Sequence, residues 1–175
     1  PSNSSAASDV YKRQSTDYGV NRWKRSTQQF TPYYLGTQNN PPKQEKSFLL
    51  GITSGKHIIC YVKEQGLFCF DDRKQEFVSL KNDLPDDIRN FVIDSKDRIF
   101  FLTGHGQLLH YQLTVRNSCP ELSFKEEIRH CAPVSNIYLS QDCLIINDDR
   151  TLTVSQDNRI LDSINIPKNK TVSPF

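Results

Sequence analysis

The side chains that could carry acid–base chemistry are scattered along this chain rather than clustered. Four of them are histidines: His57, His105, His110 and His130. No nucleophile or acid stands at a spacing that would position it beside any of them, so packed or solvated histidines are favoured over catalytic ones. Adjacent carboxylates occur twice, as Asp86-Asp87 and Asp148-Asp149. Neighbouring side chains in a strand or turn point apart, so we interpret both pairs as turn residues. We therefore expect no enzyme activity and no cofactor.

Metal and thiol chemistry is also weakly supported. The five cysteines are Cys60, Cys69, Cys119, Cys131 and Cys143. None forms a C-x-x-C pair, and none lies at zinc-ligand spacing from a histidine, so no metal site is expected. Cys60, Cys69 and Cys143 fall within predicted strands, where cysteine acts as a small hydrophobic residue. We expect buried free thiols, and the sequence leaves open whether Cys60 and Cys69 face each other across a hairpin.

Two further motifs are interpreted as turns. Gly104-His105-Gly106 resembles the start of a phosphate loop, but no helix follows it that could hold a phosphate at its N-terminus. We predict a hairpin turn there. Asp94 precedes another polar turn, where an aspartate commonly accepts backbone N–H bonds, so a structural role is expected for it.

These residues are carried by a cassette of short apolar strands and polar turns that recurs along the chain. Its fullest copy runs from residue 88 to residue 111, and others cover residues 48–71 and 134–146, with a fragment at residues 16–30. Gly19, Gly66 and Gly106 stand 47 and 40 positions apart. A period of roughly 40 to 45 residues that holds four short strands is typical of a propeller blade.

The sequence thus predicts an all-β fold, a partial β-propeller of about three and a half four-stranded antiparallel blades. Residues 15–36 would end an upstream blade, residues 37–80 and 81–125 would each form one blade, and residues 126–175 would form another and begin the link to the next. Residues 37–46, 81–87 and 126–132 are expected to be connections. The continuous apolar run 99–102 predicts a middle strand buried on both faces, whereas the alternation over 76–80 predicts an outer strand.

Residues 1–14 do not share this pattern. They resemble a translated adapter remnant, so we interpret them as a non-native segment and exclude them from the fold. With the first blade incomplete and no closing motif before Phe175, we expect the chain to be a slice of a longer propeller that is marginally stable by itself.

Three stretches resemble the two-component regulator propeller repeat. Residues 84–94 follow its "L-P-x-x-x-I-x-x-I-x-x-D" strand, and residues 66–71 and 16–23 follow its "x-x-G-L-x-R-Y/F-D" strand, with Phe77 and Phe30 beyond them. The pattern also departs from the repeat. The Trp and Gly of its "W-I-G-T" element are Phe100 and Leu102 here, and in the last copy the Thr and Gly are Asn147 and Arg150.

This resemblance implies the periplasmic sensor region of an inner-membrane hybrid two-component regulator. Such a sensor would bind oligosaccharides, and it would signal through histidine-kinase and other domains absent from this chain. The remaining blades of the parent propeller would be further partners, and the parent would be compatible with a homodimer. The alternative hypothesis is a non-catalytic protein–protein interaction scaffold. A propeller enzyme would require convergent catalytic residues on one face, which the sequence does not offer.

The weak candidates for ligand binding are Arg89, Asn90 and Asn136. Arg89 and Asn90 begin a predicted innermost strand, from which side chains can reach a propeller face, and Asn136 is the repeat equivalent of Asn90. The competing interpretation is that all three are ordinary residues at the start of a strand. Trp23 could stack on a sugar, but we expect it to pack between blades instead.

Charge and hydropathy exclude other classes of partner. The formal net charge is only +2, and the basic cluster around Trp23 is better explained as a solvated strand edge, so we expect no nucleic-acid binding. No apolar run approaches the ~20 residues that a membrane span needs. No membrane span is therefore expected within this chain.

Overall fold

The computed structural model describes residues 11–16, 19–34, 48–80, 83–116, 119–130, 132–157 and 159–166. All regular structure in these residues is β, in four antiparallel sheets whose strands pair in chain order. We name the sheets blades 1 to 4. Blade 1 holds β1 (Tyr11–Thr16), β2 (Gly19–Lys24) and β3 (Gln29–Tyr33). Blade 2 holds β4 (Phe48–Ile52), β5 (Ile58–Val62), β6 (Gly66–Asp71) and β7 (Glu76–Ser79).

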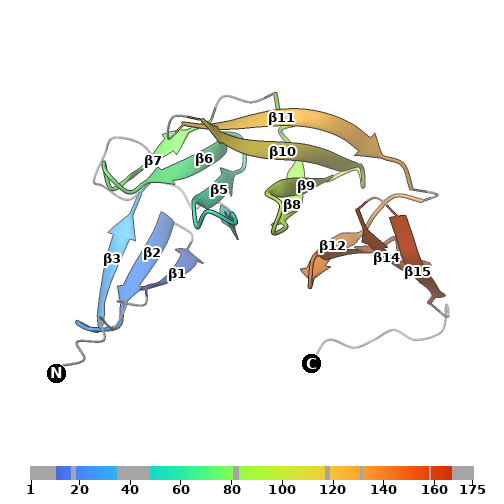
Figure 1. The fold of residues 1–175 in the computed structure, drawn as a ribbon, viewed down its shortest axis with the longest axis horizontal. Helices are drawn as coiled ribbons and strands as arrows, with labels where there is room; N and C mark the ends of the chain where they lie inside the picture. Colours follow the sequence, from blue (N-terminus) through green and yellow to red (C-terminus); the bar gives the residue numbers. More distant parts are fainter. Residues whose placement is uncertain are drawn as a thin grey trace, which may run out of the picture.

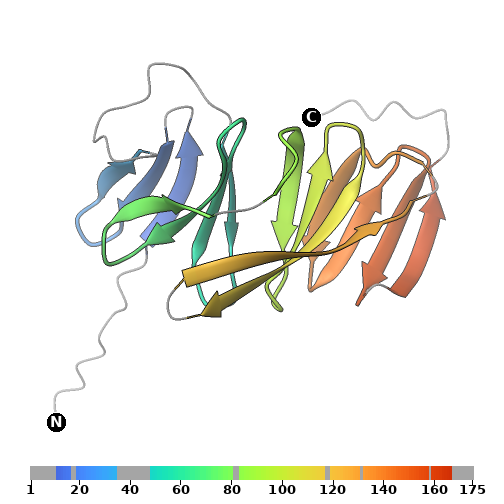
Figure 2. The same cartoon turned by 90° about the horizontal axis from the view of Figure 1, so that it is seen from above.

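The other two sheets also have four strands each. Blade 3 holds β8 (Ile88–Ile93), β9 (Arg98–Thr103), β10 (Leu108–Arg116) and β11 (Cys119–Ile128). Blade 4 holds β12 (Asn136–Ser140), β13 (Cys143–Asn147), β14 (Thr151–Gln156) and β15 (Arg159–Asn165). Figure 1 shows the four blades fanned along an arc, with β8 and β12 toward its concave side and β10 and β11 on its convex side. From above, the blades stand side by side, and the long β10–β11 hairpin (yellow to gold) reaches from blade 3 toward blade 2 (Figure 2).

Two strand boundaries differ from the sequence-based expectation. β11 continues to Ile128, beyond the expected end of its blade at residue 125, because it pairs with the whole length of β10, from Leu108↔Ile128 to Arg116↔Cys119. Its charged residues 125–127 have the pattern of a connection, but they form an exposed outer strand.

β1 begins at Tyr11, inside the segment interpreted as non-native. Its backbone pairs with β2 from Tyr11↔Lys24 to Thr16↔Gly19, so the first of the three strands of blade 1 begins before residue 15, where we expected the fold to start. Residues 1–10 lie outside the described part of the chain, as do the expected loop 37–46 and residues 168–170. The foreign origin of residues 1–14 stays a prediction.

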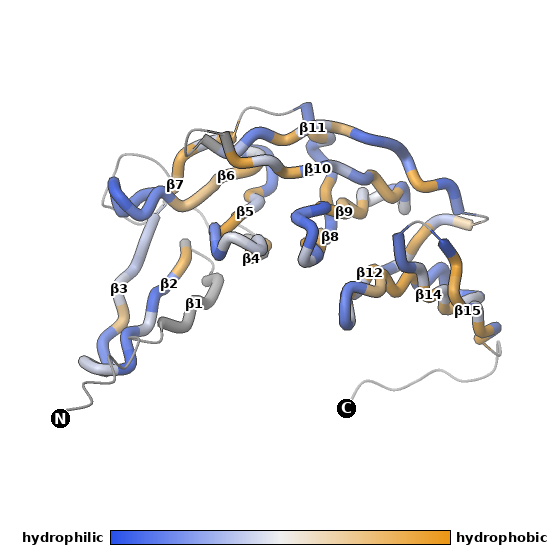
Figure 3. Tube along the Cα trace, viewed as in Figure 1, coloured by the Kyte–Doolittle hydropathy of each residue, from blue (hydrophilic) through white to orange (hydrophobic). Residues whose placement is uncertain are grey.

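The apolar core lies between the blades. In β9, Ile99 and Phe101 join a cluster shared with blade 2, whereas Phe100 and Leu102 join a cluster shared with blade 4. All four side chains are buried, which confirms that this middle strand is covered on both faces. A third cluster, around Ile58, packs blade 2 against blade 1. Figure 3 shows the contrast between hydrophobic strands such as β6 and the largely hydrophilic β11.

The free thiols of Cys60 and Cys69 lie on opposite faces of their sheet. Both are buried, but Cys60 lies in the cluster toward blade 1 and Cys69 in the cluster toward blade 3. They occupy opposite faces of blade 2, so they do not face each other across the hairpin. Burial raises the pKa of Cys60 to about 12 and, with help from Asp71 and Asp72, that of Cys69 to about 11. Both thiols are therefore protonated and unreactive near neutral pH.

A serine-to-aspartate contact joins neighbouring blades at the turns after β4 and β8. The backbone N–H and Oγ of Ser54 donate to the carboxylate of Asp97 at 2.5 and 2.7 Å. The same two groups of Ser95 donate to Asp142 at 3.0 and 2.7 Å. The contact thus recurs from blade 2 to blade 3 and from blade 3 to blade 4. It fixes the turns of adjacent blades relative to one another.

Asp94 has the structural role expected for it. Its Oδ1 accepts the N–H groups of Lys96 and Arg98 at 2.9 Å each, and its Oδ2 accepts a hydrogen bond from Nε of Arg98. Arg98 and Lys96 also contact Asp157 of blade 4 at 2.9 and 2.7 Å. The turn that Asp94 closes is therefore tied to the next blade as well.

Gly51 of β4 lies close against side chains of β8. A Cβ there would lie 2.6 Å from Cε2 of Phe91 and 2.7 Å from Cδ1 of Ile93, which are packed side chains of the next blade. We expect Gly51→Ala to lower the free energy of unfolding by about 1–3 kcal/mol, because overpacking pushes the blades apart. Urea unfolding followed by circular dichroism measures this.

The matched control is Gly55→Ala. Gly55 is exposed, and its nearest neighbour is the movable ring of His57 at 3.2 Å, so the change should stay within about 0.5 kcal/mol. Equal stabilities for the two variants would contradict the close approach of the blades.

The Ser95–Asp142 contact predicts a pH effect. The hydrogen bonds from the Ser95 side chain and backbone hold the pKa of Asp142 below its usual value. This gives stability that is present above the unfolded pKa of about 3.9 and is lost as the pH falls through the lower folded value. Ser95→Ala should therefore make the urea midpoint fall less steeply below about pH 4. Ser79→Ala, on the exposed side of β7, should keep the original slope, and an unchanged slope in Ser95→Ala would refute the linkage.

Candidate functional site

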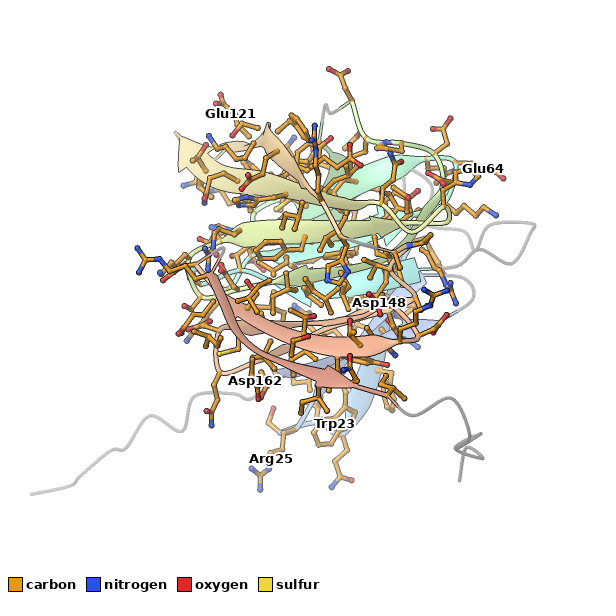
Figure 4. All side chains as sticks on the ribbon, turned by 90° about the vertical axis from the view of Figure 1, so that its right-hand side faces the viewer. Trp23, Arg25, Glu64, Glu121, Asp148 and Asp162 are labelled. Carbon is orange, nitrogen blue, oxygen red and sulfur yellow. The ribbon has the colours of Figure 1, made fainter. Side chains whose placement is uncertain are left out.

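A polar hollow of about 540 Å³ opens between blades 3 and 4. It lies on the side that carries the connections between blades and the β9–β10 and β13–β14 turns, which we name the connection face. Figure 4 shows Glu64 and Asp148, from the β5–β6 and β13–β14 turns, on this side and Glu121 on the other. The hollow is lined by Arg89 and by residues 104–106, 132–135 and 148–150. A volume of this size suits a few side chains or a short chain segment rather than a folded domain.

Two arginines supply the positive charge of the hollow. Arg89 lies at a β-bulge, where the β8–β9 register shifts between Ile88 and Asn90. A bulge bends the strand and re-aims the side chain of the extra residue. Arg150 ends the β13–β14 turn, directly after Asp149, which has a φ of +67°. Both arginines are exposed, and within the described part of the chain neither guanidinium forms a hydrogen bond or an ion pair.

Asp148 is a buried carboxylate that shapes the turn beside Arg150. Its Oδ1 accepts the N–H groups of Arg150 at 3.0 Å and Thr151 at 2.7 Å, and its Oδ2 lies 3.1 Å from Nδ1 of His130. Burial alone would raise the pKa of Asp148, but these N–H donors and His130 together hold it below its usual range. The carboxylate is therefore charged, and its charge is taken up by its own turn.

The two members of this aspartate pair point apart, as expected. Asp149 is exposed, and its N–H donates to Oδ1 of Asn147 at 3.0 Å. Asp148 is buried behind it. The pair is thus one structural carboxylate and one carboxylate that remains at the surface of the hollow. It is not an acid/base couple.

The glycine turn forms the wall of the hollow on blade 3. Gly106 N–H donates to the Thr103 carbonyl at 3.1 Å, which confirms the expected hairpin turn. The Gly106 carbonyl accepts the N–H of Val134 at 3.0 Å, and a Cβ on Gly106 would lie 2.7 Å from Cβ of Pro133. With a φ of +80° as well, this position requires glycine. His105 projects into solvent, with its Nε2 3.7 Å from Oδ2 of Asp87.

The structure separates the three residues proposed from the sequence as ligand-binding candidates. Arg89 lines the hollow. Asn90 and Asn136 meet between blades 3 and 4, where Nδ2 of Asn90 donates to Oδ1 of Asn136 at 3.1 Å and to the Ile137 carbonyl at 3.2 Å. Nδ2 of Asn136 donates to the Tyr138 hydroxyl at 2.8 Å. The two amides thus bond to each other across the blades.

The sequence did not indicate Arg150 and Asp149 as candidates for ligand binding. The available signal was the repeat itself, since residues 148–150 occupy the turn of blade 4 that residues 104–106 occupy in blade 3. Trp23 was expected to pack between blades. The described residues place no blade against its side of β2, so this stays a prediction. Trp23 pairs with Phe30, which is 61% exposed, and lies on the opposite side of β2 from the buried Val20.

Other chemistry finds little support in the described residues. No group of three His, Cys, Asp or Glu side chains gathers there as a metal site. His110 is buried, stacks on Phe100 and lies 3.3 Å from Glu126, which is a packed rather than an accessible position. The same part of the chain contains no helix that could cross a membrane.

Comparison with known proteins shows similarity at the level of fold. No protein-family model matches the chain. No curated protein matches it either. Solved structures of U3-55K and of the WD40 repeats of RRP9 align with 84% of the chain, each at 12% identity, with TM-scores of 0.55 and 0.54. The fold is a partial β-propeller. The Dos1 propeller aligns with 87% of the chain, at 12% identity and a TM-score of 0.50.

These similarities confirm the propeller repeat and the predicted fold class. The chain spans 45%, 44% and 41% of the lengths of these three solved chains, which is less than half of each. None of the three is described as a two-component sensor. That finer assignment stays a prediction from the repeat pattern.

The turn carboxylate gives a direct test of this geometry. Asp148→Asn removes the charge that two N–H groups and His130 face, so we expect the free energy of unfolding to fall by about 1–2 kcal/mol. Asp149→Asn is the matched control and should change it by less than about 0.5 kcal/mol. Chemical unfolding of both variants at neutral pH measures the difference. A larger loss in Asp149→Asn would show that the two carboxylates have been assigned the wrong roles.

Proposed function

We propose that this chain is part of a non-catalytic β-propeller that binds a protein partner on its connection face, through the hollow between blades 3 and 4. The observation that carries the proposal is the pair of arginines that line this hollow and have no ion-pair partner among the described residues. By contrast, the side chains of Asp148, Asn90 and Asn136 near them already form hydrogen bonds within the fold. Charged groups that a fold does not use for its own stability, placed in a concave site, are the usual mark of recognition.

The composition of the lining favours a protein partner over an oligosaccharide. A sugar site commonly sets polar groups beside an aromatic platform, but the lining of the hollow includes no tryptophan, tyrosine or phenylalanine. Trp23, the one tryptophan, lies in blade 1, at the other end of the arc from blade 4 (Figure 1). Periplasmic oligosaccharide sensing therefore stays a prediction from the repeat resemblance alone.

A library of displayed peptides selected against the full chain tests the proposal. We expect selection to enrich peptides whose binding is lost when His105→Trp fills the hollow, because His105 is exposed and lines it. Arg73→Trp places the same bulk on an exposed turn of the opposite face and should leave binding unchanged.

Two results would overturn the proposal. One is a selection in which every enriched peptide binds His105→Trp as well as the parent chain. The other is heat on titration of a glycan panel into the chain that disappears in His105→Trp, which would support the oligosaccharide hypothesis.

A further inference from the structure

We infer that the segment bound in this hollow is an acidic linear peptide, which presents a carboxylate or phosphoryl group to Arg89 and Arg150. The inference rests on the proposed function and names the chemistry of the partner. The first observation is that the two arginines lack ion-pair partners in the described part of the chain. Arg98, elsewhere in blade 3, is held by Asp94 and Asp157, whereas Arg89 and Arg150 have no such partner within the described residues. Planar guanidinium groups match the oxygens of carboxylate and phosphate, so these two are ready for an anion.

The backbone carries both arginines in defined positions. Arg89 sits at the bulge of β8, whose flanking residues Ile88 and Asn90 remain paired with β9. The N–H of Arg150 donates to Asp148 at 3.0 Å, and its carbonyl accepts the N–H of Ile166 at 2.7 Å. Little backbone ordering is therefore needed when an anion binds, which reduces the cost of association.

The two aspartates of the hollow define what kind of anion fits. Asp148 directs its charge into two N–H groups and His130, so it opposes a bound anion only weakly. Asp149 stays exposed at the surface of the hollow and repels a ligand that carries phosphates along its whole length. A single anionic group with neutral neighbours satisfies both conditions. With a net charge of only +2 for the chain, this favours a peptide over a nucleic acid.

Labelled twelve-residue peptides of Gly, Ser and Ala with one central variable residue test the inference by fluorescence anisotropy. We expect peptides with central Glu or phosphoserine to bind, and those with central Ser or Lys to bind at least about 10-fold more weakly. Stronger binding of phosphoserine than of Glu would identify the phosphoryl source, and the reverse order would identify the carboxylate source.

Arginine variants assign the binding to the hollow. Arg89→Ala and Arg150→Ala should each lower the affinity for the anionic peptides by about 10- to 100-fold. Arg73→Ala, on the opposite face, should leave that affinity unchanged. Because both side chains are exposed and unpaired, these variants should fold, and circular dichroism checks this. The double variant Arg89→Glu with Arg150→Glu should bind the Lys peptide in place of the Glu peptide, a reversal that unfolding cannot produce.

The outcomes separate the inference from the proposed function. The selected peptides could fail to bind His105→Trp and yet bind Arg89→Ala and Arg150→Ala normally. That result would support the connection face as the binding site and refute an acidic partner. Equal binding of the Glu and Ser peptides would refute it too. So would a twelve-nucleotide oligouridine that binds more tightly than the phosphoserine peptide and depends on the same arginines.

Discussion

The structure depends on covering both faces of each middle strand. In β9 the side chains alternate between blade 2 and blade 4, and none of Ile99, Phe100, Phe101 or Leu102 is more than 3% exposed. Each such side chain contributes about 1.5–3 kcal/mol when it is fully buried, compared with about 0.5–1.5 kcal/mol for a typical hydrogen bond. Apolar packing between blades therefore outweighs the polar contacts at their edges. A blade without neighbours would lose its main source of stability.

The polar contacts have a different role, and it differs between the two faces. On the face opposite the connections, serine–aspartate contacts and the Lys96–Asp157 ion pair join consecutive blades. Exposed pairs of this kind contribute little to stability, but they define how neighbouring turns sit. On the connection face, Arg89 and Arg150 form no ion pair with any residue that the structure describes. The contacts between turns thus align the blades on one face, and our proposal assigns the other face to contact with a partner.

The parts of this fold that could be predicted from sequence are those where one residue type has one structural use. Runs of apolar residues such as 99–102 identify doubly buried strands, and Asp94 and Gly106 identify turns, because few other residues can take their places. The strand β1 and the end of β11 escaped prediction. Their pairing uses backbone groups, which every residue has, and their sequences show no strict alternation of apolar and polar residues.

The candidate site was harder to predict, because it depends on contacts between segments about 45 residues apart. The sequence pattern correctly brought Asn90 and Asn136 to equivalent positions in their blades. It could not show that their amides would bond to each other, since that depends on the distance between blades. Arg89 stayed available because a bulge turns it out of the ladder, and a bulge has no reliable sequence signal here. Arg150 was noted only as a departure from the repeat pattern, although it lies on the opposite wall of the same hollow.

The position of the hollow couples binding to the packing of the propeller. One wall belongs to blade 3, through Arg89 and the glycine turn, and the other belongs to blade 4, through the Asp148 turn. The hydrogen bond from Val134 to Gly106 and the close contact of Pro133 with that turn hold the walls together, and the buried cluster around Leu102 and Ile137 lies between the same two blades. A ligand that contacts both walls binds only when the blades are packed. Binding therefore stabilises this interface by RT ln(1 + c/Kd), where c is the free ligand concentration, and a change that lowers the packed fraction of the protein weakens the apparent affinity in proportion to that fraction.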